Sequence, residues 1–164
     1  METPLRSVDQ LMPFATAGEL CAKRSEPVIS VAPQVSVLQA LQKMVDQDIG
    51  FLVVIENDRL VGVLSERDCA RRVLLESRSA TEVSVRDIMV TRVHTVPPEW
   101  RVPECITLMH ERGVRHLPVA VGDRVQGVLS VRDLMASLIE RHERLLRRLN
   151  EERLTILFPD PSSY

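Results

Sequence analysis

The apolar positions of this chain change their spacing several times between residues 28 and 75. An apolar, β-branched run at residues 28–31 predicts a short strand, which ends before Pro33. Beyond this proline the apolar residues adopt the spacing of an amphipathic helix. They are Val37, Leu38, Leu41, Met44 and Val45.

The next segment, FLVVIENDRLVGVLS at residues 51–65, contains two apolar runs on either side of Asn57 and Asp58. Such a pair is typical of a tight turn, so the segment predicts a β-hairpin. A second helix is predicted to begin near Ser65, and its apolar residues are Cys69, Ala70, Val73 and Leu74. The small polar residues at 77–84 predict a linker, which completes a β-α-β-β-α unit.

This unit occurs twice. Residues 28–68 align without gaps on residues 93–133 at a constant offset of 65 positions, and GVLSERD at 62–68 returns as GVLSVRD at 127–133. Self-similarity at a fixed period indicates one supersecondary unit used twice. A single unit of this size buries little apolar area, so we predict an α+β fold in which both units pack sheet to sheet about a pseudo-two-fold axis. Equivalent loops would line a crevice between them.

The remaining segments flank the repeats. We divide the chain into an N-terminal segment with a short helix (1–24), a first repeat (25–78), a second repeat (84–140) and a C-terminal helical extension and tail (141–164). Thr16 and Glu19 have the spacing of a capping box that opens the short helix, and residues 84–89 are its counterpart. The apolar stripe past Asp133 continues into RHERLLRRLNEER. This pattern favours either packing on its own domain or the pairing of two subunits, and we expect a homodimer.

Composition and charge narrow the range of functions. The chain has 164 residues, of which 45% are hydrophobic, as expected for a globular fold. A net charge of −2 and an aromatic content of 3% disfavour nucleic acid as a partner. No apolar run approaches the roughly 20 residues of a membrane-spanning helix, and the N-terminus lacks a secretory h-region. We therefore expect a cytoplasmic protein without a membrane partner.

The cysteines and histidines form no recognisable ligand or catalytic pattern. The cysteines are far apart, and the chain has neither C-x-x-C nor H-E-x-x-H spacing. We therefore expect no metal site, no required cofactor and no enzymatic activity. The residues concerned are Cys21, Cys69, Cys105, His94, His110, His116 and His142.

The repeated motif has two interpretations. In the first, Ser-x-x-Asp is a capping box, in which Ser65 caps the following helix and Asp68 reaches back. This leaves the recurring glycine and arginine unexplained. In the second, the motif is a nucleotide site: glycine admits a close approach, serine and the helix N–H groups bind an anion, arginine clamps a phosphate, and aspartate accepts both hydroxyls of a ribose. Both interpretations remain open on the residues alone.

The duplicated β-α-β-β-α order, the two G-h-h-S-x-x-D motifs and RHLPV at residues 115–119 resemble the paired CBS (cystathionine β-synthase) domain, or Bateman module. The resemblance covers about residues 25–140 and is greatest to small stand-alone bacterial proteins of the signal-transduction type. It implies adenosine sites in the cleft between the repeats. The implied regulatory ligand is AMP, with ATP, ADP, NAD and S-adenosylmethionine as further candidates.

The resemblance also implies the residues of two sites. The first, which we favour, would hold a ribose on Ser65 and Asp68 and place Arg67 near the phosphate. Its members would be Val63, Ser65, Arg67, Asp68, Thr95, Val96, Pro97, Val114, Arg115, His116, Leu117 and Pro118. The second site is expected to be weaker, because its arm lacks cationic residues. Its members would be Ser30, Val31, Ile49, Gly50, Phe51, Val128, Ser130, Arg132 and Asp133.

We therefore expect a non-catalytic adenine-nucleotide sensor, whose output acts on the dimer itself or on an unidentified protein in trans. A structural or oligomerisation module without functional ligand binding is the alternative. It predicts dimerisation that ignores nucleotide.

Overall fold

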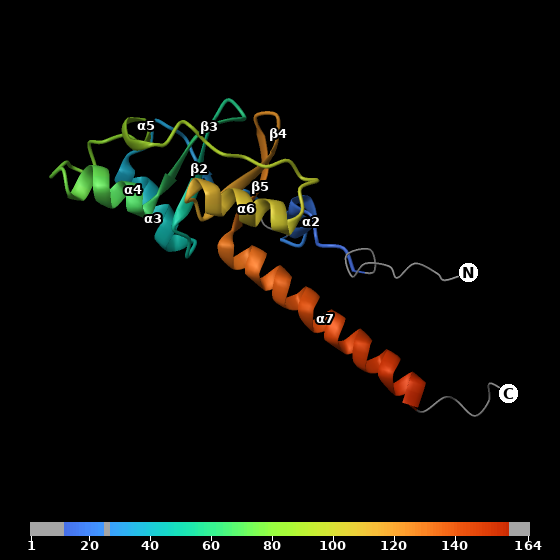
Figure 1. Cartoon of the computed structure of the whole chain (residues 1–164). Coiled ribbons are helices and arrows are strands. Elements are labelled where there is room, and N and C mark those ends of the chain that lie inside the picture. Colours follow the sequence, from blue (N-terminus) through green and yellow to red (C-terminus); the bar gives the residue numbers. More distant parts are fainter. Residues whose placement is uncertain (1–11, 25–26, 158–164) are drawn as a thin grey trace.

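The structure of the protein is a computed structural model that describes residues 12–24 and 27–157 (Figure 1). Its elements follow the predicted order in full in the first repeat and, except for the first strand, in the second, and they confirm the α+β fold class. The first repeat contains β1 (Ser30–Val31), α3 (Val37–Asp46), β2 (Phe51–Glu56), β3 (Arg59–Ser65) and α4 (Glu66–Cys69), which continues as the π-helical turn η1 (Ala70–Leu74). The second contains α6 (Val102–Arg112), β4 (His116–Val121), β5 (Arg124–Ser130) and α7 (Val131–Leu157). Two short helices, α2 (Ala17–Ala22) and α5 (Val85–Ile88), precede the repeats.

The two β-hairpins are built in the same way. Phe51 pairs with Ser65 in the first hairpin and His116 pairs with Ser130 in the second, and both ladders shift register after their fourth pair. Asn57 and Asp58 both have positive φ, at 51° and 61°, which is the geometry of the turn that the sequence predicted. The two predicted β-hairpins are thus confirmed, and they share a register shift that the sequence did not predict.

The first strand of each unit differs between the copies. In the first repeat, β1 pairs in parallel with β2 and completes a three-stranded sheet. In the second, the equivalent strand is reduced to one parallel bridge between Val96 and Val119 beside the two-stranded sheet β4-β5. The last helix also differs, because α7 continues to Leu157 and extends away from the rest of the molecule (Figure 1).

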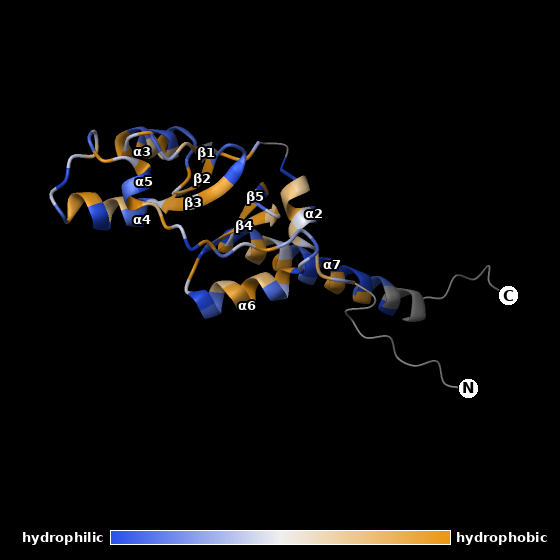
Figure 2. Cartoon of the chain, turned by 90° about the horizontal axis from the view of Figure 1, so that it is seen from above, coloured by the Kyte–Doolittle hydropathy of each residue, from blue (hydrophilic) through white to orange (hydrophobic). Residues whose placement is uncertain are grey.

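Each short helix packs into the core of the repeat that it does not precede. Ala17 and Leu20 of α2 are buried among the core residues of the second repeat, and Ala17 N donates to Trp100 O at 2.7 Å. Val85 and Ile88 of α5 are fully buried in the core of the first repeat. Figure 2 shows α2 beside β4 and β5, and α5 beside α3 and α4. Neither repeat therefore completes its core from its own residues.

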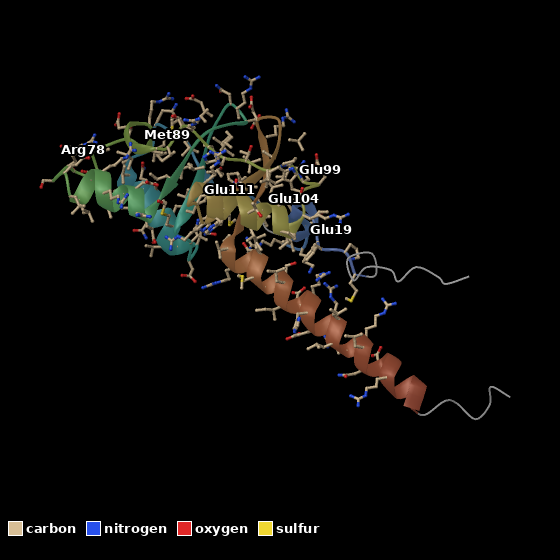
Figure 3. The ribbon with its side chains drawn as sticks, in the orientation of Figure 1. Glu19, Arg78, Met89, Glu99, Glu104 and Glu111 are labelled. Carbon is tan, nitrogen blue, oxygen red and sulfur yellow. The ribbon has the colours of Figure 1, made fainter. Side chains whose placement is uncertain are left out.

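The glycines of the repeated motif are covered by α2 and α5 and the residues next to them, which we call the crossing segments because each packs on the opposite repeat. A Cβ at Gly127 would be 2.8 Å from the Cβ of Cys21 and still closer to its Sγ, and a Cβ at Gly62 would be 2.8 Å from the Sδ of Met89. Met89, labelled in Figure 3, directly follows α5. The sequence indicated a close approach at both glycines, and the approaching groups are side chains of the protein itself.

We predict that Gly127→Ala lowers the free energy of unfolding by about 1–3 kcal/mol, the usual cost of overpacking, because the new methyl group displaces Cys21 and with it α2. Urea denaturation measures this loss. Gln126→Ala, at an exposed position of the same strand, is the control and should change stability by less than about 0.5 kcal/mol. Equal stability of the glycine variant and the control would contradict the close packing of α2.

Candidate functional site

The last four residues of each motif, 65–68 and 130–133, are called the first and the second motif end. The first motif end forms a capping box that leaves one carboxylate oxygen unused. Ser65 ends β3 and caps α4, with its Oγ donating to Asp68 Oδ2 at 2.5 Å and its backbone N donating to the same oxygen at 3.0 Å. The Asp68 backbone N donates in turn to Ser65 Oγ at 3.2 Å. The capping interpretation is thus realised. It uses only Oδ2, and Oδ1 of this half-buried aspartate has no hydrogen bond or ion pair with any residue that the structure describes.

The second motif end carries the same box and one further contact. Ser130 donates to Asp133 Oδ2 from its backbone N at 2.6 Å and from its Oγ at 2.7 Å. Asp133 Oδ1, however, forms an ion pair with Nη2 of Arg24. The Asp133 side chain is only 15% exposed, so the guanidinium covers the oxygen that corresponds to the unpaired one in Asp68. Both oxygens of Asp133 are therefore occupied.

A stacked ring pair connects the two motif ends. The rings of Phe51 and His116 lie 4.5 Å apart, centroid to centroid, with an interplanar angle of 12°. Each ring stands opposite the capping serine of its own hairpin, Ser65 for Phe51 and Ser130 for His116. The stack therefore brings the beginnings of the two motif helices together at the junction between the hairpins.

The environment of His116 favours its neutral form. Burial lowers the pKa of His116, the nearby Arg115 guanidinium lowers it further, and Asp133 acts in the opposite direction. A neutral imidazole stacks on Phe51 without the desolvation cost of a charge. His116 therefore acts at neutral pH as an aromatic wall between the two motif ends.

The structure brings only part of each expected site together. Arg115 directly precedes β4, and its carbonyl accepts from Val131 N at 3.0 Å. The next residue, His116, contacts the first hairpin through its ring. The exposed side chains of Arg67 and Arg132, each in the first turn of its motif helix, make no hydrogen bond or ion pair with the described residues. Both guanidinium groups are available to an anion.

Several other expected site residues serve the fold. The side chains of Val31, Val96 and Leu117 are buried in the two cores. The backbone N and O of Val63 both pair with Val90, and those of Val96 pair with Pro118 and Ala120. The backbone N–H groups of Val63 and Val96 are therefore already used and cannot donate to an adenine edge.

Sequence reasoning missed Arg24. This residue follows α2, and no motif marks it. The sequence does indicate that the segments before the two repeats are equivalent, because Thr16 and Ser84 both open capping boxes and lie 68 positions apart. Only the packing of α2 onto the opposite repeat, however, shows that Arg24 reaches the second motif.

The described residues offer little for metal or thiol chemistry. Within them, no group of three or more His, Cys, Asp or Glu side chains is placed to hold a metal ion. Burial raises the pKa of the Cys69 and Cys105 thiols to about 11, so both stay protonated and weakly nucleophilic at neutral pH. No helix in this part of the chain is long and apolar enough to cross a membrane.

An apolar groove of about 220 Å³ lies between α6 and α7 and extends to the first turn of the second motif helix. It is lined by Ile106, Met109, His110, Val114, Val131, Leu134 and Met135. Val131 is the residue that replaces Glu66 in the second copy of the motif, so this substitution provides an apolar wall where the first repeat has a carboxylate.

Comparisons with known proteins agree with this architecture. The family model described as "CBS domain" matches the chain twice, at residues 17–75 and 85–140. The mitochondrial CBS domain-containing protein CBSX3 of Arabidopsis thaliana is 32% identical over 120 residues, a match that covers 70% of this chain and 58% of that protein. The chain thus corresponds to little more than half of this relative's length.

Solved structures show the same fold. The crystal structure of the CBS domain protein NE2398 is 35% identical, with a TM-score of 0.72, and the match covers 77% of this chain and 98% of that one. The CBS domain pair of protein MJ0100, solved in complex with 5′-methylthioadenosine and S-adenosylmethionine, has a TM-score of 0.69 at 20% identity and covers 79% of this chain and 99% of that one. The latter likeness concerns the fold alone.

The lowered pKa of His116 predicts a pH-dependent stability. Because protonation is easier in the unfolded chain, the contribution of the neutral ring is complete above a pH of about 6.5 and is lost as the pH falls below that value. His116→Phe keeps a ring on Phe51 and removes the titration. Its stability relative to the wild type should therefore rise as the pH falls from about 7.5 to about 5, by at most about 1.4 kcal/mol per pH unit, the slope for one proton.

Urea unfolding of both proteins at several pH values measures this difference. A difference in unfolding free energy that is constant over the pH range, or of opposite sign, would contradict the buried neutral ring.

Proposed function

Since this chain belongs to the CBS domain family, we propose that it is a non-catalytic regulatory module that binds an adenine nucleotide between its two repeats. Pairs of CBS domains are in general regulatory rather than catalytic. AMP is the first candidate ligand, and ATP, ADP, NAD and S-adenosylmethionine share the adenosine group on which the proposal rests.

The unpaired oxygen of Asp68 carries this proposal. Among the described residues Asp68 Oδ1 has no partner, and it is open to solvent, because no buried side-chain oxygen of these residues lacks a hydrogen bond. It is therefore free to accept a further hydrogen bond. A ribose hydroxyl supplies that bond as a donor. The exposed Arg67 lies one residue before Asp68, in the same helical turn, and is available for a phosphate.

The first site therefore centres on Ser65, Arg67 and Asp68, with the Phe51–His116 stack beside it. The residues expected opposite, from Thr95 to Pro97 and from Val114 to Pro118, remain part of the proposal. Their contribution is restricted to side-chain surface and to the few backbone groups that the sheets leave unpaired.

The regulatory step we propose is a change in how the two hairpins meet. The hairpins contact each other at both ends, through the Phe51–His116 stack and through Leu60 N, which donates to Asp123 O at 2.9 Å. A nucleotide beside the stack acts on this junction. Its effect on any partner is limited by the difference between its affinities for the two arrangements.

A second candidate function, self-association, is favoured by the surface of α7. Five apolar side chains of this helix are about half exposed: Val131, Met135, Ile139, Leu146 and Leu149. At 100° per residue they fall within a sector of about 80°, which makes a single stripe continuous with the groove between α6 and α7. Figure 2 shows the hydrophobic segments recurring along α7. We propose that a second copy of the chain covers this stripe, as a homodimer.

The location and the target of the protein also remain proposals. We propose a cytoplasmic protein that acts in trans on a protein partner, although one relative is named as mitochondrial. The exposed stripe of α7 is available to such a partner where it is not occupied by a second copy.

For nucleotide binding, we predict that AMP at about 100 times its dissociation constant stabilises the stripped protein by about 2.7 kcal/mol, and that Asp68→Ala abolishes this effect. Differential scanning fluorimetry with each candidate ligand measures it. Asp87→Ala is the matched control, because Asp87 forms the same box with Ser84, with bonds of 2.9 and 2.7 Å. Both variants lose a cap, but only Asp68→Ala should lose the ligand response. An equal response in all three proteins would contradict a site at Asp68.

For self-association, we predict that Met135→Lys converts the dimer into a monomer, because a charge in the stripe must be desolvated on pairing. Light scattering coupled to size-exclusion chromatography measures the mass. Leu75→Lys, at an exposed apolar position outside the stripe, should leave the dimer intact. A wild-type monomer at micromolar concentration would refute the homodimer.

A further inference from the structure

The two motif ends differ in one contact, which the second motif end makes with a side chain from outside the motif. Asp68 and Asp133 form the same capping box through Oδ2, but within residues 12–24 and 27–157 only Asp133 has a partner at Oδ1, the guanidinium of Arg24. The same guanidinium donates from Nη1 to the carbonyl of Val128 at 3.4 Å. Arg24 therefore spans the end of β5 and the first turn of α7.

The cause of this difference lies in the segments after the two crossing helices. After α5, Met89 is extended, with φ −62° and ψ 152°, and Val90 pairs with Val63 through both of its backbone groups. After α2, Lys23 keeps helical angles, φ −64° and ψ −21°, and Arg24 N donates to Cys21 O. Among the described residues, the backbone after α2 therefore makes no pairing with β5 like that of Val90 with Val63.

The guanidinium of Arg24 consequently contacts Val128 where, in the other half, the Val90 backbone contacts Val63. Val63 and Val128 are equivalent positions of the two repeats. A backbone contact at Val63 leaves Asp68 Oδ1 unpaired, whereas a side-chain contact at Val128 brings a positive charge onto Asp133 Oδ1.

We infer that Arg24 decides which of the two motif ends takes the nucleotide: it occupies the carboxylate oxygen that a ribose would need at Asp133 and leaves Asp68 as the single site. This inference rests on the proposed function and explains its asymmetry. The Arg24 side chain is 51% exposed, so its hold on Asp133 is moderated by solvent. Removal of the guanidinium makes the two motif ends alike.

The test is the number of AMP molecules bound per chain, measured by equilibrium dialysis on the full-length protein with radiolabelled AMP. We expect one for the wild type and two for Arg24→Ala, with the additional site lost again in Arg24→Ala/Asp133→Ala. In the Asp68→Ala background the number should rise from zero to one when Arg24→Ala is added. Arg24→Met, which keeps the aliphatic stem, serves if the alanine variant does not fold.

Lys23→Ala is the matched control, because it removes the neighbouring positive charge, which pairs with Glu140 at 3.1 Å and not with Asp133. It should leave one AMP per chain. One AMP in both the wild type and Arg24→Ala would overturn the role of Arg24 while the proposed function stands, as would two in the wild type. Failure of every protein in the series to bind AMP would overturn the proposed function and this inference together.

Discussion

Packing of each short helix into the opposite repeat is the constraint on which the rest of this structure depends. Ala17 and Leu20 close the second core, and Val85 and Ile88 close the first. The two repeats consequently cannot separate without removing α2 from the second core and α5 from the first. Gly62 and Gly127 occur in the repeated motif at the points where these crossing segments lie on the sheets, so the glycine of the motif belongs to the folding of the molecule.

The same constraint brings the two motif ends together and makes them unequal. The crossing holds the hairpins so that Phe51 stacks on His116, and each ring stands beside the serine that opens a motif helix. The chain after each short helix differs, with a paired extended segment after α5 and a tight turn at Lys23 and Arg24 after α2. Two copies of a seven-residue motif that differ at a single position thereby yield one open and one occupied carboxylate.

Much of the fold could be predicted because its signals are local or periodic. The offset of 65 positions defines the duplication, the Asn57-Asp58 pair defines a hairpin turn, and Ser-x-x-Asp defines a helix start. The capping and ligand interpretations of the motif are also compatible, since the box uses one oxygen of Asp68 and leaves the other. The packing of α2 on the second repeat and of α5 on the first could not be predicted, because no sequence pattern links either helix to the repeat on which it packs. The ion pair of Arg24 depends on that packing and joins residues 109 positions apart.

The central claim is that an adenine nucleotide binds at the first motif end. Its most direct test is an NMR titration of the uniformly ¹⁵N-labelled, nucleotide-free protein with AMP, with the backbone amides assigned. The account predicts chemical-shift changes that saturate and centre on residues 65–68 and on Phe51, with much smaller changes at residues 130–133. Changes centred on residues 130–133, or no saturable change at either motif, would contradict it.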